Sequence, residues 1–339
     1  MSAATSIPET SRLNGLMHAI RYYEYGAADV LRYEQVPLPT PGPGEVRIKV
    51  TAVGLNFTEI YQRRGWYNGT APFPLPLGGE LAGVIDAVGP EVRGFQVGER
   101  VATADAVGAY AEYALAPAAK VVALPAHVSN EQGAALLLQG VTAQYLAYST
   151  YPLKAGETAL IHAAAGGVGL LLVQIAKKIG ARVIATVSTE EKAALARAAG
   201  ADEVILYSTQ DFLAETMRLT SNSGVEVVYD SVGKTTFAQS LQCLKVRGYL
   251  VLYGQASGPV EPIDPRVLNS RSLYLTRPSR NSYTITREEL ITRVAPLFEW
   301  VSQDALSVRI DRTFPLKDAT AAQRYMEDRG TRGKVLLLP

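Results

Sequence analysis

The stretch whose chemistry can be read most directly is a glycine-rich turn, where residues 162–169 read His-Ala-Ala-Ala-Gly-Gly-Val-Gly. A short apolar run, Thr158–Ala163, suits a buried strand, and the helix formers that follow the turn end at Gly180. Small residues at such a turn let a pyrophosphate reach the N–H groups at a helix start, where the helix dipole favours an anion. This pattern predicts a nucleotide site. The alternative is a glycine turn needed only for helix–strand packing.

The order of small residues in this turn refines the prediction. The dinucleotide fingerprint G-x-G-x-x-G is filled by Ala164, Gly166 and Gly169, with alanine in place of the first glycine. A second buried strand follows at residues 182–187, which completes a strand–turn–helix–strand unit of roughly thirty residues. We therefore expect the cofactor phosphates to be bound at Gly166, Gly167, Val168 and Gly169.

The end of the second strand bears on which dinucleotide binds. An NAD site places an acidic residue there, about twenty residues past the glycines, but this chain has Val187. Ser188 and Thr189 follow, then Lys192, and Tyr207 comes after the next strand. A hydroxyl, a cation and a phenol suit the 2′-phosphate of NADPH, although two glutamates after Thr189 weaken the case. Thr189 could equally cap a helix, with a solvated Lys192, and the two roles are compatible.

The elements that must position this turn define two domains. From residue 158 strands alternate with helical segments, which predicts a doubly wound parallel sheet of the Rossmann type. Before it, dense short strands with Gly and Pro turns predict a β-rich, barrel-like domain. Strands expected at residues 307–311 and 333–338 should return to that first domain, so that the cofactor domain is an insertion.

The domain boundaries can be placed from these patterns. We expect an N-terminal extension at residues 1–16, a catalytic domain at 17–138 plus 287–339, and the cofactor domain at 139–286. Ser129 and Gln132 have the spacing of a capping box at a helix start. A second helix is expected at Gly140–Tyr151, a long helix near residues 287–303, and a strand at 272–275.

Composition excludes several classes of function. The 339 residues are 47% hydrophobic. Their net charge of +1 gives no strong electrostatic attraction for nucleic acid or an anionic membrane. No apolar run approaches the roughly 20 residues of a membrane helix, and the first residues show no signal-peptide pattern. The single cysteine, Cys243, leaves no internal disulfide and no cysteine cluster for zinc. A reducing cytoplasm is the expected setting.

Further motifs lie in order along nearly all of residues 17–339. Together with the glycine turn, they resemble zinc-independent quinone oxidoreductases (the quinone reductase and zeta-crystallin-like family) of the medium-chain dehydrogenase/reductase superfamily. This resemblance implies a GroES-like catalytic domain, an inserted Rossmann domain, NADPH and a homodimer. The segments that carry it are Asn56-Phe, Tyr61, Gly65-Trp-Tyr67, Leu77-Gly-Gly-Glu80, Gln139-Gly-Val-Thr142, Asp230-Ser-Val-Gly233, Tyr253-Gly-Gln255, Leu275-Thr-Arg-Pro278 and Gly333-Lys334-Val.

Zinc-dependent relatives of this superfamily provide a contrast. They bind a catalytic zinc through Cys, His and a further Cys or Asp. Here Leu55 and Asn56 occupy the region of the first ligand, and Gly79 stands where the second would be. Glu80 remains, but one carboxylate does not make a site that normally needs three protein ligands. We therefore predict chemistry without zinc.

The resemblance also assigns residues to the reaction. It implies that Asn56 and Tyr61 lie near the nicotinamide, and that Thr142, at a helix start, lies beside it. Tyr67 falls where related enoyl thioester reductases carry an active-site tyrosine, so Asn56, Tyr61 and Tyr67 are the predicted catalytic residues. A neutral phenol can donate a hydrogen bond to an oxygen that gains charge, or deliver a proton. The alternatives are core packing for Tyr61, an exposed loop position for Tyr67 and a buried helix threonine for Thr142.

Residues after the later strands should complete the cofactor site. Ligands of such sheets bind at the carboxyl ends of the strands, although glycines there also serve turns. Arg277 and Lys334 are expected to supply positive charge near the phosphates or the substrate, unless they are solvated. His162 is expected to be a packed core histidine. The remaining predicted cofactor contacts are Ser231, Gly233, Tyr253, Gly254 and Gln255.

The function predicted from these observations is NADPH-dependent reduction of a quinone or a similar electron-poor acceptor. The alternative is reduction of an activated C=C bond in an alkenal, enone or enoyl thioester, which would use the same cofactor and tyrosines. A second alternative is a non-catalytic NADPH- or RNA-binding protein, because members of the family have been recruited to such roles. The balanced charge speaks against RNA.

Overall fold

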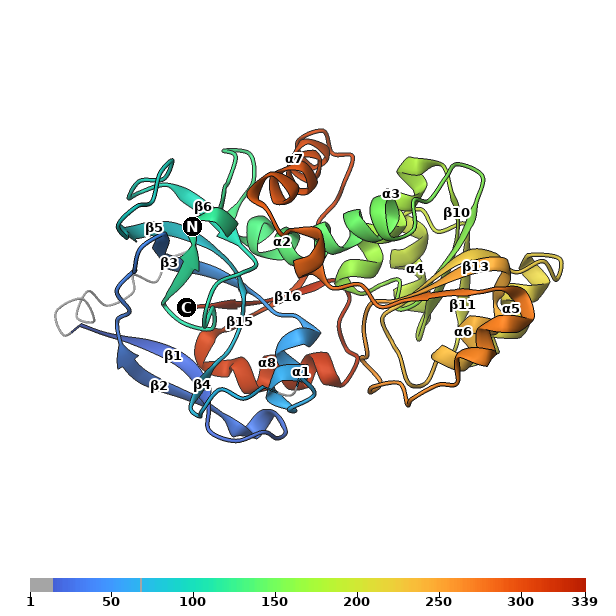
Figure 1. Ribbon diagram of the computed structural model, residues 1–339, viewed down its shortest axis with the longest axis horizontal. Helices are drawn as coiled ribbons and strands as arrows, with labels where there is room; N and C mark the ends of the chain where they lie inside the picture. The colour runs from blue at the N-terminus through green and yellow to red at the C-terminus, as the bar shows by residue number, and fades with distance from the viewer. Residues whose placement is uncertain (1–14, 68) are drawn as a thin grey trace.

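A computed structural model describes residues 15–67 and 69–339. One part of the fold, on the left of Figure 1, is a seven-stranded sheet with the strand order β15-β16-β3-β5-β6-β8, in which β7 also pairs with β3. A three-stranded sheet, β2-β1-β4, lies in the same part. The strand bounds are β1 Leu16–Tyr22, β2 Leu31–Pro37, β3 Glu45–Gly54, β4 Leu75–Pro76, β5 Glu80–Val88, β6 Arg100–Thr103, β7 Tyr113–Pro117, β8 Val122–Ala123, β15 Ile310–Pro315 and β16 Lys334–Leu338.

The second part is a six-stranded parallel sheet with the order β11-β10-β9-β12-β13-β14. Its central strands are mostly apolar and almost entirely buried, as expected when helices cover both faces. The doubly wound sheet predicted from the alternation is therefore confirmed. Its strands are β9 Thr158–Ile161, β10 Arg182–Val187, β11 Glu203–Leu206, β12 Val225–Asp230, β13 Leu244–Leu252 and β14 Tyr274–Thr276.

Helices connect and cover these sheets, and α2 and α3 lie between the two parts in Figure 1. Apolar side chains of α2 and α3 pack in one continuous core that also includes residues of both large sheets. In the described residues, no helix is both long enough and apolar enough to cross a bilayer. The helices are α1 Phe57–Arg63, α2 Asn130–Tyr145, α3 Gly167–Ile179, α4 Glu190–Ala198, α5 Phe212–Leu219, α6 Phe237–Gln242, α7 Arg287–Ser302 and α8 Ala319–Glu327.

Helix α2, which lies between the two parts, differs from its prediction. The capping box of Ser129 and Gln132 is present, but α2 runs without a break through Gly140 to Tyr145 and ends in a π-helical turn at Leu146–Thr150. The separate helix expected at Gly140–Tyr151 is therefore wrong. A Cβ at Gly140 would lie 3.0 Å from Leu297 of α7, so this glycine permits close packing of two helices rather than ending one.

Other boundaries differ by small amounts. The strand expected at residues 272–275 is Tyr274–Thr276, the one expected at 307–311 is Ile310–Pro315, and α8 was not predicted. β15 and β16 do return to the first sheet, as expected. Residues 1–14 of the predicted extension lie outside the described residues, and β1 begins inside its expected range.

The last strand of the chain carries a buried charge into the centre of the fold. Lys334, the first residue of β16, is 1% exposed, and its Nζ lies 2.5 Å from Glu80 Oε2 and 2.8 Å from Asn56 Oδ1. Glu80 begins β5 and is fully buried, and its Oε1 accepts the backbone N–H of Leu138 in α2 at 2.7 Å. One ion pair therefore joins β16, β5, α2 and the residue that precedes α1.

Two amides complete this cluster. Asn56 Nδ2 donates to Glu80 Oε2 at 2.9 Å, and Gln139 Nε2 of α2 donates to Asn56 Oδ1 at 3.2 Å. A buried ion costs several kcal/mol to remove from water, and this cost is offset only where partners satisfy its hydrogen bonds. Both ions of the pair have such partners. We call Lys334, Glu80, Asn56 and Gln139 the polar cluster.

The ion pair predicts a particular pattern of stability. Lys334→Met leaves the Glu80 carboxylate buried without its cation, and should lower the free energy of unfolding by about 3–5 kcal/mol. The double variant E80Q/K334M buries no charge and keeps an acceptor for the Leu138 N–H. It should recover much of that loss. Denaturant unfolding followed by circular dichroism measures both effects, and a double variant no more stable than K334M would contradict this account.

Candidate active site

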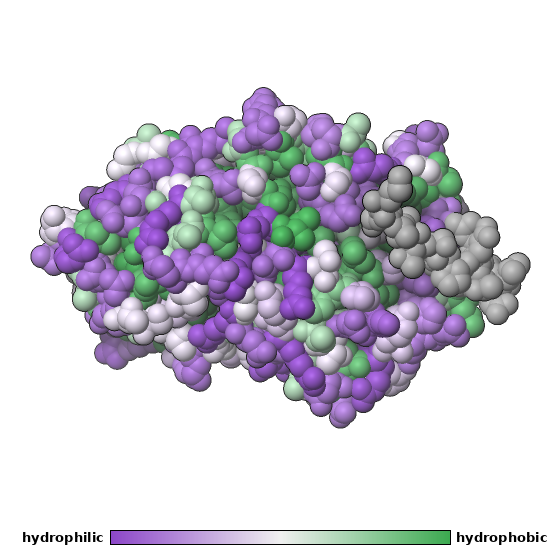
Figure 2. Space-filling view, turned by 180° about the vertical axis from the view of Figure 1, so that it is seen from behind, coloured by the Kyte–Doolittle hydropathy of each residue, from purple (hydrophilic) through white to green (hydrophobic). Residues whose placement is uncertain are grey.

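A cleft of about 1280 Å³ is lined by residues from both large parts of the fold. From the first part come α1, the segment after β6 and the loop between α8 and β16. From the second come the glycine turn and the segments that follow β10, β12, β13 and β14, at the carboxyl ends of the parallel strands. On the face shown in Figure 2, hydrophobic residues are exposed near the middle and are surrounded by mostly hydrophilic ones.

The glycine turn lies on the wall of this cleft. A Cβ at Gly169 would lie 2.3 Å from the carbonyl oxygen of Ala163, and one at Gly167 would lie 1.9 Å from Gln139 Oε1. Packing against the backbone therefore requires Gly169, whereas a side chain at position 167 would displace the Gln139 amide. A Cβ at Gly166 would meet only the Ala163 oxygen, at 3.2 Å, and would otherwise fill the cleft. Gly166 thus opens a cradle in front of the first N–H groups of α3, which have no partner within the helix. This arrangement fits a pyrophosphate.

Hydroxyl and cationic groups gather where the end of β10 meets the cleft. Ser188, Lys192 and Tyr207 all line it there. Lys192 Nζ donates to the backbone oxygen of Arg329 at 2.6 Å, and burial and the nearby Arg332 guanidinium lower its pKa. No acidic residue stands at the end of β10, so this corner suits a 2′-phosphate rather than a bare ribose.

The two glutamates that weakened the prediction of NADPH have cationic partners. Glu190 lies 2.9 Å from Arg197, and Glu191 lies 2.7 Å from Arg332. Thr189 caps α4 and accepts the backbone N–H of Lys192 at 3.3 Å. The capping role considered for Thr189 is thus present, and its side chain does not line the cleft.

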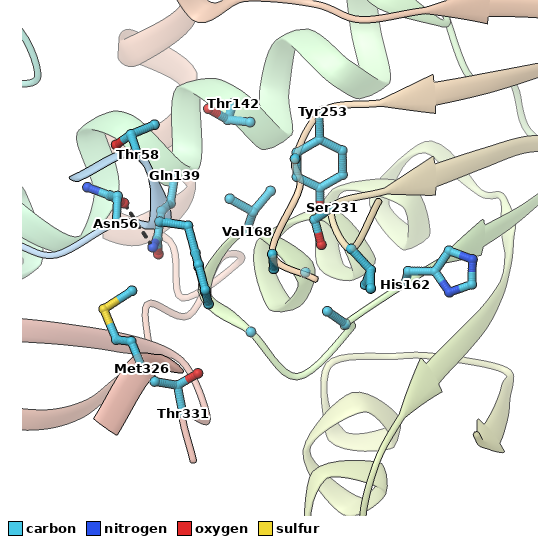
Figure 3. Close-up of a pocket in the computed structure, with 18 of the residues that line it drawn as sticks. Asn56, Thr58, Gln139, Thr142, His162, Val168, Ser231, Tyr253, Met326 and Thr331 are labelled. Atoms are coloured by element: carbon cyan, nitrogen blue, oxygen red, sulfur yellow. Dashed lines mark hydrogen bonds between the residues drawn. The ribbon is translucent and has the colours of Figure 1, made fainter. Parts of the chain in front are cut away.

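The loop between α8 and β16 supplies residues that the sequence did not reveal. Arg329 and Thr331 line the cleft near Lys192, although they lie more than 130 positions away in the chain. Met326 and Thr331 come from this C-terminal segment, next to the glycine turn (Figure 3). The neighbouring Arg332 pairs with Glu191, which further ties the loop to α4. No motif marks these residues, because their place depends on the return of β16 to the first sheet.

At the end of the cleft away from Lys192, the Tyr61 side chain reaches from α1 to the segment after β13. Its hydroxyl oxygen accepts the backbone N–H of Gln255 at 3.1 Å, so α1 touches the segment after β13. Arg277 Nη2 donates to Gln255 Oε1 at 2.6 Å. Burial holds the pKa of the Tyr61 hydroxyl well above its usual value. Tyr61 is therefore a neutral phenol whose oxygen accepts one hydrogen bond, and its proton has no acceptor among residues 15–67 and 69–339.

Aromatic side chains surround Tyr61. Trp66 stacks on it with ring centroids 5.4 Å apart, and Tyr67 meets its edge at 5.9 Å. Tyr67 is 47% exposed but lines the cleft, and burial raises its pKa. The exposed position considered for Tyr67 and the predicted active-site position are therefore both compatible with the structure.

The polar cluster borders the same end of the cleft. Asn56, Gln139 and Thr142 lie on one side and Tyr253 and Ser231 on the other (Figure 3). Asn56 is 4% exposed and Thr142 is 7% exposed, yet both line the cleft. The glycine turn, with Val168, lies between the two groups in this view. The cleft thus offers a continuous surface from the anion cradle to Asn56 and Tyr61.

Lys334 requires a correction. Its ammonium was expected near the phosphates or the substrate, or else on the solvated surface, but it is buried and neutralised by Glu80. Gly233 and Gln255 also lie outside the cleft lining: Gly233 forms a turn with φ +87°, and Gln255 holds Tyr61 and Arg277. Apart from Thr189, the other predicted residues line the cleft: Asn56, Tyr61, Tyr67, Thr142, Gly166, Gly167, Val168, Gly169, Ser188, Lys192, Tyr207, Ser231, Tyr253, Gly254 and Arg277.

His162 is buried, and each of its ring nitrogens has a hydrogen-bond partner, as expected of a core histidine. Its Nδ1 lies 2.8 Å from Thr186 Oγ1 and its Nε2 lies 3.0 Å from Ser240 Oγ. Ser240 in turn donates to Asp230 Oδ2 at 3.0 Å. Burial lowers the pKa of the imidazole, so it stays neutral. It is among the residues that line the cleft, and both of its ring nitrogens have hydrogen-bond partners.

Asn56 and Glu80, two of the positions compared above with zinc-dependent relatives, belong to the polar cluster. Within residues 15–67 and 69–339, no three His, Cys, Asp or Glu side chains come close enough to share a metal ion. The Lys334 ammonium contacts Asn56 and Glu80, which lie at or beside the ligand positions of those relatives. A side-chain cation therefore occupies the place beside Glu80.

Two family models match the chain. The model of the alcohol dehydrogenase GroES-like domain matches residues 42–126, and that of the zinc-binding dehydrogenase matches residues 167–300. A quinone oxidoreductase of Pseudomonas aeruginosa is 45% identical over 94% of this chain and 99% of its own length. A 2-haloacrylate reductase of a Burkholderia species is 43% identical over 94% of this chain and 97% of its own.

Solved structures agree with these sequence matches. A mycobacterial protein in complex with NADPH is 48% identical and superposes with a TM-score of 0.92, covering 95% of this chain and 100% of its own. The Escherichia coli quinone oxidoreductase, also in complex with NADPH, is 40% identical with a TM-score of 0.93 and the same coverage. With its parallel sheet, GroES-like part and glycine turn, the chain belongs to the quinone oxidoreductase family of the medium-chain dehydrogenase/reductase superfamily.

Proposed function

We propose that this protein is an NADPH-dependent quinone reductase. The observation that supports this most strongly is the continuous cleft, which joins an anion cradle at Gly166 and a cationic corner at Lys192 to a buried phenol at Tyr61. The NADPH complexes of relatives at 40% and 48% identity support the cofactor. The name of the Pseudomonas relative supports the acceptor.

In this proposal the chain's own residues bind and orient. Gly166 and the start of α3 receive the pyrophosphate, and Ser188, Lys192 and Tyr207 receive the 2′-phosphate. When bound, NADPH supplies two electrons and a proton from C4 of its nicotinamide ring. Thr142 and Asn56 border that end of the cleft. Positioning and exclusion of water therefore account for most of the catalysis.

Tyr61 stabilises the acceptor as charge develops on its oxygen. Its phenol accepts the Gln255 N–H, and accepting one hydrogen bond strengthens the donor character of the hydroxyl. A neutral donor placed where charge forms lowers the barrier without first giving up its proton. Tyr67 adds a flat surface at the same end of the cleft, which suits a planar acceptor, and Trp66 stacks on Tyr61 without lining the cleft itself.

The domain roles, the absence of zinc, the homodimer and the cytoplasmic location are part of the same proposal. Residues 17–138 with 287–339 act as the catalytic domain, residues 139–286 act as the cofactor domain, and residues 1–16 extend the chain. The protein acts without zinc, as a homodimer in the cytoplasm. The polar cluster and the balanced net charge of +1 are compatible with these assignments.

A second candidate is reduction of activated C=C bonds. It is favoured by the 2-haloacrylate reductase at 43% identity, and it would use the same cofactor corner and the same phenol. The two candidates differ in the acceptor's shape. A quinone is a rigid ring, whereas a haloacrylate or an alkenal is narrow.

The cationic corner at Lys192 should make the protein bind NADPH more tightly than NADH. Lys192→Ala should weaken NADPH binding about 10–100-fold, because a charge-assisted hydrogen bond to the 2′-phosphate is lost, and leave NADH binding within about twofold. Titration of nicotinamide fluorescence gives both dissociation constants. Lys234→Ala, at an exposed lysine outside the cleft lining, is the matched control. Equal effects of K192A on both cofactors would contradict the phosphate assignment.

The acceptor preference can be measured directly. We expect kcat/KM with NADPH to be at least about tenfold higher for a set of quinones than for alkenals, enones and 2-haloacrylates, because the aromatic end of the cleft favours planar rings. Steady-state oxidation of NADPH measures each rate. A reversed preference would establish the C=C candidate instead. NADPH binding with no turnover of either set would indicate a non-catalytic protein.

A further inference from the structure

The cleft lining includes a buried acidic side chain that the proposed function does not use. Glu59, in the first turn of α1, is 2% exposed and lines the cleft. Its Oε2 accepts the backbone N–H of Asn56 at 2.6 Å as part of a capping box. The cap explains why an acceptor stands at this position. A glutamine would serve the cap equally, so the cap does not explain why a carboxyl is buried here.

The second oxygen of this carboxyl faces a hydroxyl. Glu59 Oε1 lies 3.2 Å from Thr58 Oγ1, and Thr58 also lines the cleft. Thr58 lies on the same side of the cleft as Asn56, Gln139 and Thr142 (Figure 3). A two-member path therefore leads from a buried carboxyl to the end of the cleft where the acceptor would bind.

Charge balance favours a protonated Glu59. The groups that face it are Lys334 of β16, Glu80 of β5, Tyr110 and Tyr67. The single cation, Lys334, is already paired with Glu80, so an ionised Glu59 would be a surplus buried anion. In agreement, burial raises the pKa of Glu59 to about 7, although Lys334 acts to lower it.

The carboxylates of the other acidic residues in the cleft lining have cationic or backbone N–H partners. Arg280 Nη2 lies 2.7 Å from Asp105, and Arg63 Nη2 lies 2.9 Å from Glu327. Asp211 caps α5 by accepting two backbone N–H groups. Of the acidic residues that line the cleft in the described part of the chain, Glu59 alone combines complete burial with no cationic partner within salt-bridge distance.

We propose that Glu59 is the proton donor of the reaction and acts through the Thr58 hydroxyl. This assignment rests on the proposed function, because quinone reduction takes up a proton that NADPH does not supply. A quinone gains two electrons and two protons, and both electrons and one proton come from NADPH. The Glu59 O–H bond breaks toward Thr58 Oγ1 while the Thr58 O–H bond breaks toward the reduced quinone oxygen. Hydroquinone, NADP⁺ and the Glu59 carboxylate result, and the carboxylate regains a proton from water when the product leaves.

The test uses Glu59→Gln, which keeps the acceptor for the Asn56 N–H and removes the acid. The matched control is Glu289→Gln, because Glu289 forms the same capping box at the start of α7, away from the cleft lining. We expect E59Q to slow quinone reduction in a single turnover about 100-fold, while the Kd for NADPH stays within about twofold. The wild-type rate should fall as the pH rises above about 7, because the acid form is lost, and this limb should vanish in E59Q.

Two further measurements make the proposal independent of activity alone. Infrared spectra of the protein without cofactor should show the stretching band of a protonated carboxyl at pH 7, and E59Q should lack this band whereas E289Q keeps it. Thr58→Val should slow the turnover as E59Q does, and Thr58→Ser should recover most of that loss because it keeps the hydroxyl.

Each outcome decides something. A missing carboxyl band, an E59Q rate within about threefold of the wild type, or an unchanged pH limb would overturn the role of Glu59 while the proposed function stands. A wild-type protein that binds NADPH but reduces no quinone would overturn the proposed function, and the proton-donor role with it.

Discussion

The Lys334–Glu80 ion pair is the interaction on which the active end of this molecule depends. It brings the last strand of the chain into contact with β5, α2 and the start of α1, four elements that are far apart in the sequence. Two charges in a dry interior stabilise a fold only when every polar atom around them is satisfied. Asn56 and Gln139 meet that demand, and their side chains are thereby fixed at the edge of the cleft. Structure and site share one set of hydrogen bonds.

That pair also controls the charge of its surroundings. Because Lys334 and Glu80 neutralise one another, Glu59 has no cation left to hold it ionised, and the Tyr61 phenol is likewise kept neutral by burial. The opposite end of the cleft differs in character, with Lys192 and Arg329 close to solvent and N–H groups at the start of α3. The cleft therefore has an electropositive end for phosphates and an aromatic end for the acceptor, where Tyr61 and Glu59 are neutral and Arg277 is bound to Gln255.

Much of this arrangement could be predicted from the sequence, because it depends on local patterns. The glycine turn, the capping box at Ser129 and the alternation of strands and helices are set by neighbours a few residues apart. The lining of the cleft by Ser188, Lys192 and Tyr207 follows from the rule that ligands bind at the carboxyl ends of parallel strands.

What the sequence did not reveal depends on long-range packing. Lys334 looked like a cation for the ligand, and only the return of β16 beside Glu80 shows that it is buried and paired. Arg329 and Thr331 reach the cofactor corner through the same return. The break expected at Gly140 is absent because that glycine accommodates Leu297, a residue of a helix more than 140 positions later. No local pattern encodes such contacts.

The central claim is that this cleft passes electrons from NADPH to a quinone. It is tested most directly by adding one equivalent of a quinone to the protein–NADPH complex without oxygen and following the absorbance of the reduced nicotinamide. We expect complete loss of that absorbance, with one hydroquinone formed per NADPH, at a rate far above that of the same mixture without protein. A reduced nicotinamide that stays unchanged, or that is lost no faster than without protein, would contradict it.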